Sequence, residues 1–414
     1  TQEGGFQTDP DWGSLMDDKD GIDSSDIGSG MVFVAGQGQQ SCQTEFRWNM
    51  GEKPWKYPPR MDDGRGGASF QHLGEYRAQT WNKAYAGNSS KFLKPKAQIF
   101  TPVIWDGTGA SHYIDVGFKP DLVVHRKRSG GSAVGFGFYD SVRGATKVFS
   151  CVTSEQASDE STVAEGLKSF DTNGFTLGTD DSVNGSGSSQ KYLAYCWKAG
   201  GNKGTWNLNG EDVGSAANAG LTAGDTSVLT GCSINTDAGF SIVTWTQDSG
   251  GAAKSIAHGL SQAPTFVWMK QRNVGSNSNI FVHHKSHTAG TELQYLNAAG
   301  AETTSSDFGN AFPTSSVITT NTTGVSGREL VMYAWHDIPG VMKTGYFTGW
   351  DADTGQSNGP KVHLGFKPAF IIIKARDHYY SWFWRDTTRN PHNPVNTAVW
   401  TNDTGAESTQ TNYD

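Results

Sequence analysis

The fold of this chain is decided by the stretch Val116–Arg128, which reads Val-Gly-Phe-Lys-Pro-Asp-Leu-Val-Val-His-Arg-Lys-Arg. A glycine-proline corner leads into a short apolar segment that ends in positive charge. The same phrase returns at His258–Arg272 and again at Leu364–Arg376. Glycine allows a tight turn, and proline fixes the backbone where a strand begins. Three copies of one unit predict a repeat protein.

The composition favours an all-β fold built from antiparallel sheets. The 414 residues include 52 glycines and 12% aromatic residues, but only 18% charged residues. Gly, Ser, Thr, Asn and Asp interrupt short apolar segments, which is typical of strands joined by tight turns. The net charge of -8 gives no basic surface for nucleic acid. No segment has the length of a transmembrane helix, and we expect no membrane insertion.

Each repeat is predicted to be an antiparallel β-sandwich. The first repeat covers residues 96–201 and the second residues 237–341, with a Gly/Asn/Thr-rich spacer at 202–236 between them. The strands that we expect lie at 98–105, 111–116, 134–139, 147–151, 169–177 (a hairpin with an Asn-Gly turn), 191–197, 239–245, 280–284, 293–296, 317–320 and 329–335, and in the third repeat at 345–350 and 378–386. An Asp-Gly turn at 106–109 is expected to join the first two of them as a hairpin.

The third repeat, residues 342–414, is predicted to be incomplete. The first two repeats close with the similar strands that end at Trp197 and Trp335. The same interval after Pro368 would place a third closing strand beyond Asp414. A sandwich without its closing strands exposes an edge, which proteins normally avoid. We expect the chain to continue; strands from a neighbouring subunit or from the N-terminal residues are the alternatives.

Residues 1–95 differ from the repeats and are predicted to form an irregular N-terminal arm or a small docking domain. The segment around 17–26 is acidic and rich in turn residues. Lys53–Arg60 contains three prolines and must be extended, because each proline moves its predecessor out of the helical region. Strand candidates are few, at 31–35 and 44–48.

Several motifs in the repeats recur in one known group of proteins. Beside the Gly-Phe-Lys-Pro corners they are Tyr139–Gly144, Ser169–Gly178, Tyr195–Gly201, Asp237–Thr244 and Arg389–Asn396. In this order they resemble the repeat-bearing β-sandwich (SPRY-like or concanavalin-like) virion proteins of tailed, often marine, bacteriophages. The resemblance covers residues 97–414. It implies a tail fibre or another surface appendage of the particle, and it brings no catalytic residues.

Two groups of residues are candidates for binding a glycan. Tyr380, Trp382 and Trp384 alternate along one strand face and can stack on sugar rings if they are exposed, whereas packing in the sandwich core is the alternative. The cations that end the three apolar strands can bind an acidic glycan, or they are solvated strand ends; they are Lys127 with Arg128, Lys270 with Arg272, and Lys374 with Arg376. We expect solvated ends for these cations.

No metal site is expected. Thr179–Gly185 and Asp351–Gly355 are rich in oxygen ligands, but neither has the spacing of an EF-hand, and turn chemistry explains their Asp, Asn and Gly residues. His283 and His287 share a face if the strand continues, yet no third ligand is in view. The four cysteines form no C-x-x-C pair, and Cys196 is expected to be a buried thiol.

The leading hypothesis is a non-enzymatic structural protein of a tailed phage particle that needs no cofactor. It would present loops for host attachment, form a homo-oligomer and contact other virion proteins through its N-terminal arm. A carbohydrate-binding module for host surface glycan is the first alternative. A tailspike-type polysaccharide depolymerase is the second. The sequence contains neither a nucleophile elbow nor a P-loop, and sequence alone places no two carboxylates at a glycosidase separation.

Overall fold

The computed structural model describes residues 99–409 except 131–133, 153–155, 188, 249–252, 276–277, 309–310, 322–324, 350–359 and 394. The chain divides into two units, Thr1–Ala97 and Gln98–Asp414. All that follows concerns the second unit. The expected arm at 1–95, with its strand candidates and the segment Lys53–Arg60, lies outside the described residues. The oxygen-rich segment 351–355 lies outside them too.

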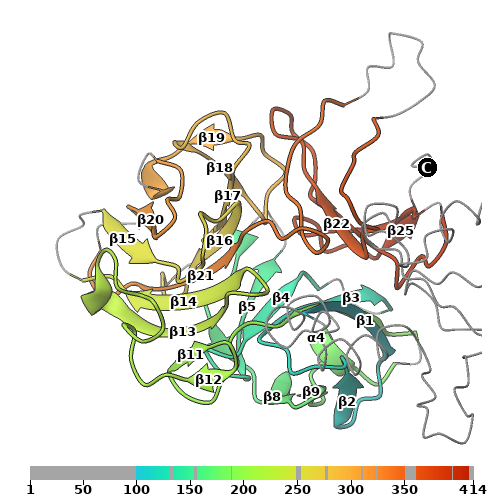
Figure 1. Ribbon diagram of the computed structural model, residues 1–414. Helices are drawn as coiled ribbons and strands as arrows, with labels where there is room; N and C mark the ends of the chain where they lie inside the picture. Colours follow the sequence, from blue (N-terminus) through green and yellow to red (C-terminus); the bar gives the residue numbers. More distant parts are fainter. Residues whose placement is uncertain are drawn as a thin grey trace, which may run out of the picture. The chain divides into compact units, whose positions relative to one another are not determined.

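The first repeat forms two sheets (Figure 1). One has the order β1-β10-β3-β4-β5-β6, with β7 also on β5, and the other has the order β2-β9-β8. Their bounds are β1 Phe100–Asp106, β2 His112–Asp115, β3 Leu122–Ser129, β4 Gly137–Asp140, β5 Lys147–Val152, β6 Gln156–Ala157, β7 Ser161–Thr162, β8 Leu167–Asp171, β9 Gly174–Leu177 and β10 Lys191–Trp197, with the short helix α4 at Asp181–Asn184.

The second repeat has the same plan. Its larger sheet has the order β12-β11-β13-β14-β21-β16-β17-β18-β19, and β15 pairs with β20. The bounds are β11 Trp206–Leu208, β12 Glu211–Asp212, β13 Leu229–Asn235, β14 Phe240–Thr246, β15 Lys254–Ala257, β16 Phe266–Gln271, β17 Ile280–His284, β18 Glu292–Tyr295, β19 Thr303–Thr304, β20 Val317–Thr320 and β21 Glu329–Trp335, with 3-10 turns η2 Thr226–Val228 and η3 Ser306–Phe308.

The third repeat contributes one four-stranded sheet. Its order is β22-β23-β24-β25, with bounds β22 Phe370–Ile373, β23 Phe383–Asp386, β24 Thr397–Trp400 and β25 Ser408–Thr409. Among the described strand pairs, all are antiparallel except β11 with β13. The predicted all-β class with antiparallel sheets is confirmed. None of the helices in the described part of the chain has the length and apolar character that crossing a membrane requires.

The three corners have the backbone that the repeated phrase predicts. Gly117, Gly259 and Gly365 have φ angles of 82°, 68° and 85°, a left-handed region that glycine enters without steric cost. The strand that follows the first corner is buried along most of its length, from Leu122 to Lys127. Both of its faces therefore need apolar neighbours, as in the middle layer of a packed β protein.

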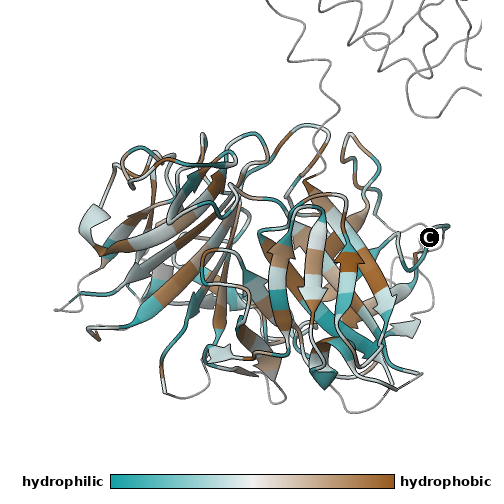
Figure 2. Cartoon of the chain, turned by 90° about the horizontal axis from the view of Figure 1, so that it is seen from below, coloured by the Kyte–Doolittle hydropathy of each residue, from teal (hydrophilic) through white to brown (hydrophobic). Residues whose placement is uncertain are grey.

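Alternate residues of these strands enter different cores. In β3, Leu122 and Val124 belong to a core that draws on all three repeats, whereas Val123 belongs to a core within the first repeat. The shared core joins Trp268 to Trp384 and to Trp197, with ring centroids 5.7 Å and 6.2 Å apart. Hydrophobic positions follow the strands in Figure 2, interrupted by polar ones. The repeats thus pack against one another around one common core.

Three expectations about the strands need correction. The Asp-Gly segment 106–109 joins no hairpin, because β1 pairs with β10 and β2 pairs with β9 in the other sheet. Residues 202–236 are no spacer, since β11, β12 and β13 extend the sheet of the second repeat. The third repeat has no strand at 345–349, and its strand β23 begins only at Phe383.

Candidate functional site: the junctions between repeats

The register of the sheets makes three positions equivalent. Asp140 lies opposite Leu122 between β4 and β3. The same place is taken by His284 opposite Phe266, and by Asp386 opposite Phe370. Each of these residues ends its strand on the side of the shared core, where the next repeat approaches.

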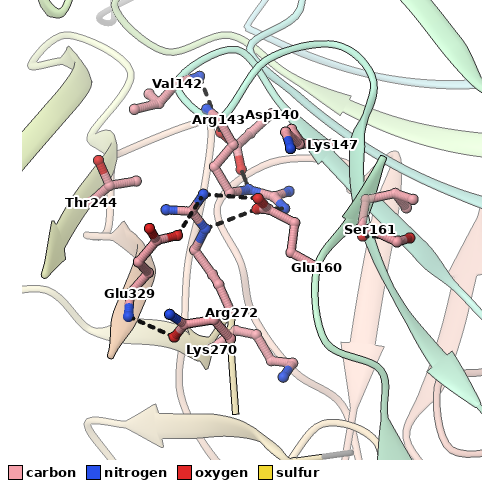
Figure 3. Close-up of polar contacts among 12 residues, drawn as sticks. Asp140, Val142, Arg143, Lys147, Glu160, Ser161, Thr244, Lys270, Arg272 and Glu329 are labelled. Carbon is pink, nitrogen blue, oxygen red and sulfur yellow. Dashed lines mark hydrogen bonds and ion pairs between the residues drawn. The ribbon is translucent and has the colours of Figure 1, made fainter. Parts of the chain in front are cut away.

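At the first junction, a buried ion pair within the first repeat meets residues of the second repeat (Figure 3). The Arg143 guanidinium donates to the Asp140 carboxylate, and neither side chain is exposed. Tyr333, from the closing strand β21, donates its hydroxyl to the same Asp140 Oδ2 at 2.6 Å. Burial raises the pKa of Tyr333 well above its ordinary value, so its hydroxyl keeps the proton that it donates.

The ion pair extends into a network. Arg143 Nη1 donates to Glu160 Oε2 at 3.0 Å, and Arg272 of the second repeat donates to the two oxygens of Glu160 at 2.8 and 2.9 Å. Arg272 also lies 3.4 Å from Glu329 (Figure 3). Burial alone would raise the pKa of Glu160, but the hydrogen bond from Arg272 and the charge of Arg143 lower it overall. Glu160 therefore remains a carboxylate that bridges two arginines.

The second junction repeats this chemistry between the first and third repeats. Tyr195, from the closing strand β10, donates its hydroxyl to Asp386 Oδ2 at 3.0 Å. Arg389 Nε donates to the same oxygen at 2.6 Å, and Arg389 Nη1 lies 3.4 Å from Glu407. Arg128 of the first repeat donates to the other oxygen of Glu407. The order tyrosine, aspartate, arginine and glutamate is the same as in the first junction.

A backbone hydrogen bond from a glutamate links each pair of repeats. The amide of Glu160 donates to the carbonyl of Arg272 at 2.8 Å, and the amide of Glu407 donates to that of Arg128 at 2.9 Å. The amide of Glu302 donates to the carbonyl of Arg376 at 2.6 Å, which links the second and third repeats. The second repeat thus holds the first, the third holds the second, and the first holds the third. The three contacts form a cycle.

The third junction differs at its centre. Its positions equivalent to Asp140 and Arg143 are His284 and His287. The side chains of Arg376 and Glu302 are still paired, with Nε 3.6 Å from Oε1. Burial lowers the pKa of His284 to about 4, so the ring is neutral at pH 7. No described residue of the third repeat supplies a closing tyrosine here, because its sheet ends at β22.

The expectation of solvated strand ends is wrong for Lys127 and Lys270, which are buried, whereas Arg376 is 45% exposed. Arg126, next to Lys127, is fully buried as well. Arg126 donates to the carbonyls of Trp400, Asp403 and Gly405 in the third repeat. A fully buried guanidinium that spans three carbonyls ties one repeat to another and is closed to an external glycan.

Lys270 and Lys374, near the ends of the second and third apolar strands, also donate to acceptors of the protein. Lys270 Nζ donates to Ser278 Oγ at 2.6 Å, and burial lowers the pKa of Lys270 to about 8. Lys374 Nζ donates to the carbonyl of Ala299 in the second repeat at 3.1 Å. Both ammonium groups therefore meet acceptors of the protein itself.

The aromatic candidates separate in the structure. Trp382 and Trp384 are 4% and 0% exposed, and Trp382 donates its indole N–H to the carbonyl of Tyr295 in the second repeat at 2.9 Å. Tyr380 is 60% exposed. Sugar stacking needs accessible rings, which only Tyr380 offers among these three.

The remaining candidates have ordinary structural roles. In the oxygen-rich segment 179–185, Asp180 caps α4 by accepting from the amide of Ser182, and Asp181 pairs with Lys127 at 2.7 Å. Cys196 is buried, as expected. His283 lies in β17 and contacts the ring of Phe312. No cluster of three or more metal-ligating side chains occurs among the described residues.

The junction residues were hidden in the sequence for a physical reason. Glu160, Glu302 and Glu407 each precede a Ser-Thr or Thr-Thr pair, and this recurrence is a signal that could have found them. Their partners come from another repeat, and a repeated phrase does not tell which copy touches which. The acids and bases of the two tyrosine junctions are bonded to one another, an arrangement suited to holding the repeats in place.

Comparisons with known proteins place this arrangement in a family. A search of the curated proteins and a search of the solved structures return no match. A family model described as a domain of unknown function (DUF7483) matches residues 95–414. This range begins just before β1 and includes all three repeats. The chain therefore belongs to the family of the domain of unknown function DUF7483.

Proposed function

We propose that this protein is a non-enzymatic structural component of a tailed bacteriophage particle, in a tail fibre or another surface appendage. The observation that carries the structural role is the cycle of contacts between repeats, in which Arg272, Arg376 and Arg128 hold Glu160, Glu302 and Glu407. The virion setting rests on the resemblance of the repeat motifs. Attachment to other particle proteins through residues 1–95 and a homo-oligomeric state are part of the proposal.

Buried ion pairs suit a scaffold better than they suit a flexible binder. A desolvated Asp-Arg pair adds little net stability, yet removing either partner is costly, so the pair favours one arrangement of its surroundings. The tyrosine hydroxyls at the first two junctions add a hydrogen bond between repeats. Such a unit holds its outer loops at fixed spacings, which is what a host-attachment appendage requires.

Localisation on particles is the direct test. Antibodies against the full chain, detected by immunogold electron microscopy of purified phage particles, should label the tail or another surface appendage. Mass spectrometry of the same particles should detect peptides from residues 98–414. Particles free of the protein by both measurements would overturn the proposal. Release of sugars from host polysaccharide by the purified chain would instead favour the depolymerase alternative.

Glycan recognition is a second candidate, favoured by one exposed aromatic pair. Tyr379 and Tyr380 are 69% and 60% exposed in the loop before β23. Binding of the full chain to a host glycan array, lost in a Tyr379→Ala/Tyr380→Ala variant that unfolds at the wild-type midpoint, would support this candidate. Binding that persists in the variant would remove these tyrosines from it.

A further inference from the structure

The strand β22 has an open edge in a place where the other repeats are closed. In the first repeat the corner strand β3 lies between β10 and β4, and in the second β16 lies between β21 and β17. The equivalent strand β22 pairs with β23 on one side and, among the described residues, with no strand on the other (Figure 1). An open edge presents unpaired backbone N–H and C=O groups to any strand that can approach.

Apolar side chains beside this edge are exposed, whereas their counterparts are buried. Ile371 and Ile373 of β22 are 38% and 37% exposed. Val267 and Met269, at the same positions of β16, are 0% exposed and lie in a core that includes residues of β15 and β20. Tyr346, in the segment before the third corner, is 76% exposed. This apolar surface belongs to a strand that is enclosed in the two other repeats.

The register of the closed repeats defines the strand that fits. Tyr195 lies opposite Val124 and Trp197 opposite Leu122, between β10 and β3. Tyr333 lies opposite Trp268 and Trp335 opposite Phe266, between β21 and β16. The two closing strands therefore share the pattern Tyr-x-Trp in one register. Transferred to β22, this register places the tyrosine opposite Ile372 and the tryptophan opposite Phe370.

The shared core already holds two tryptophans of this kind. The rings of Trp197 and Trp335 have centroids 5.9 Å apart, and Phe370 lies 6.0 Å from Trp197. A third closing strand on β22 would bring its tryptophan to the same part of this core. The open edge of β22 therefore lies beside the shared core, to which the closing strands of the other two repeats already contribute Trp197 and Trp335.

The tyrosine of a third closing strand would lie at the third junction. Tyr333 of the second repeat reaches Asp140 of the first, and Tyr195 of the first reaches Asp386 of the third. Continuing the cycle, a tyrosine from the third repeat would reach His284 of the second. The Nδ1 atom of His284 accepts from the amide of Ser286 at 3.0 Å, so the neutral ring has its Nε2–H group left to donate to a tyrosine hydroxyl.

We propose that the edge of β22 is a strand-acceptor site, and that its occupant is a β-strand with the Tyr-x-Trp pattern of β10 and β21. In both closed repeats this strand comes after the strand equivalent to β25, because β10 follows β7 and β21 follows β19. In these two repeats the acceptor strand and its closing strand therefore belong to the same repeat. This inference is independent of the virion setting.

A peptide added in trans tests the acceptor site. The peptide copies Glu329–Trp335 and carries terminal lysines for solubility, and the matched control contains Tyr333→Ala and Trp335→Ala. Hydrogen exchange of the full chain should show fast-exchanging amides in β22 that the first peptide protects. The control should bind at least about thirtyfold more weakly, because it lacks both aromatic anchors. A peptide with Tyr333→Phe should bind about threefold to tenfold more weakly.

Four results would overturn the acceptor site. They are slow exchange of β22 in the full chain alone, protection that appears without peptide as protein concentration rises, equal protection by both peptides, and no protection by either. The first would mean that another segment covers the edge, and the second would mean that another copy does.

Discussion

The first and third junctions occupy the same register positions but use different chemistry. Asp140 and Arg143 form a fully buried ion pair to which Tyr333 donates. At the equivalent positions, His284 and His287 meet no such tyrosine among the described residues. A buried carboxylate needs partners for its charge, whereas an imidazole can be buried in its neutral form. The comparison teaches that charge is placed where a neighbouring repeat supplies the hydroxyl.

The largest effect should come from breaking the charged pair of the first junction. Arg143→Ala leaves Asp140 buried without its cation, and we expect the free energy of unfolding to fall by about 3–5 kcal/mol. Urea denaturation of the full chain measures this loss. The control Lys168→Ala breaks an exposed pair with Glu165, whose side chains are 42% and 50% exposed, and should cost at most about 1 kcal/mol.

The second junction provides the matched comparison. Arg389→Ala should cost about as much as Arg143→Ala, because the pair of Arg389 with Asp386 is equally enclosed, at 1% and 2% exposure. A loss for either variant as small as that for Lys168→Ala would show that its junction is hydrated and that burial does not govern its energy.

Removing a single hydroxyl should have a smaller effect of the same kind. Tyr333→Phe and Tyr195→Phe each take a donor from a buried carboxylate, at a cost of about 1.5–3 kcal/mol in the free energy of unfolding. Tyr113, which is 49% exposed, is the control, and Tyr113→Phe should change stability by less than about 0.5 kcal/mol. If only one of the two buried tyrosines matters, the junctions are not equivalent.

Much of the fold could be predicted from the sequence because its signals are local. The corner glycines, the apolar strands and the closing strands at 191–197 and 329–335 follow from turn chemistry and hydrophobic patterning, and the structure has strands with these bounds. Such features depend on residues near one another in the chain.

The contacts between repeats could not be predicted in the same way. Asp140 and Tyr333 are separated by 193 positions, and Arg128 and Glu407 by 279. A single sequence does not tell which repeat contacts which. The cations at the ends of the apolar strands were therefore expected to be solvated. For Trp382 and Trp384 the sequence likewise leaves a stacking platform and core packing as alternatives, since alternation places them on one face without telling whether that face is covered.

Acid should weaken the second repeat through its buried histidines. Burial lowers the pKa of His258 and His284 to about 4 and of His283 to about 3, below the value of about 6.5 in an unfolded chain. The unfolded chain thus binds more protons, so stability is complete above pH 6.5 and falls as the pH drops toward 4. Each histidine contributes a slope of up to about 1.4 kcal/mol per pH unit.

The histidine contribution is checked by the slope of stability against pH. Urea denaturation between pH 7 and pH 4.5 should show a shallower slope for His284→Gln than for the wild type. The exposed residue His363 is the control, and His363→Gln should leave the slope unchanged. An unchanged slope in His284→Gln would mean that this ring is protonated within the folded protein and that the third junction is accessible to water.

The smallest effects on stability are expected for the three arginines that pair with glutamates of a neighbouring repeat. Arg272 bonds both oxygens of Glu160 and also lies near Glu329, with 14% of its side chain exposed, whereas Arg376 is 45% exposed and lies 3.6 Å from its glutamate. Arg376→Gln should therefore cost less than about 1 kcal/mol, and high salt should abolish the cost.

Arg272→Gln should cost more than Arg376→Gln and should keep most of its cost in high salt, because Glu160, which accepts two hydrogen bonds from Arg272, is only 10% exposed. Arg128, 15% exposed against Glu407, should behave like Arg272. Urea denaturation with and without 0.5 M salt (roughly a 4 Å screening length) ranks the three variants. The opposite ranking would mean that the third junction is the tight one. In that case His284 and His287, which meet no closing tyrosine among the described residues, would not mark an interface with room for a further strand.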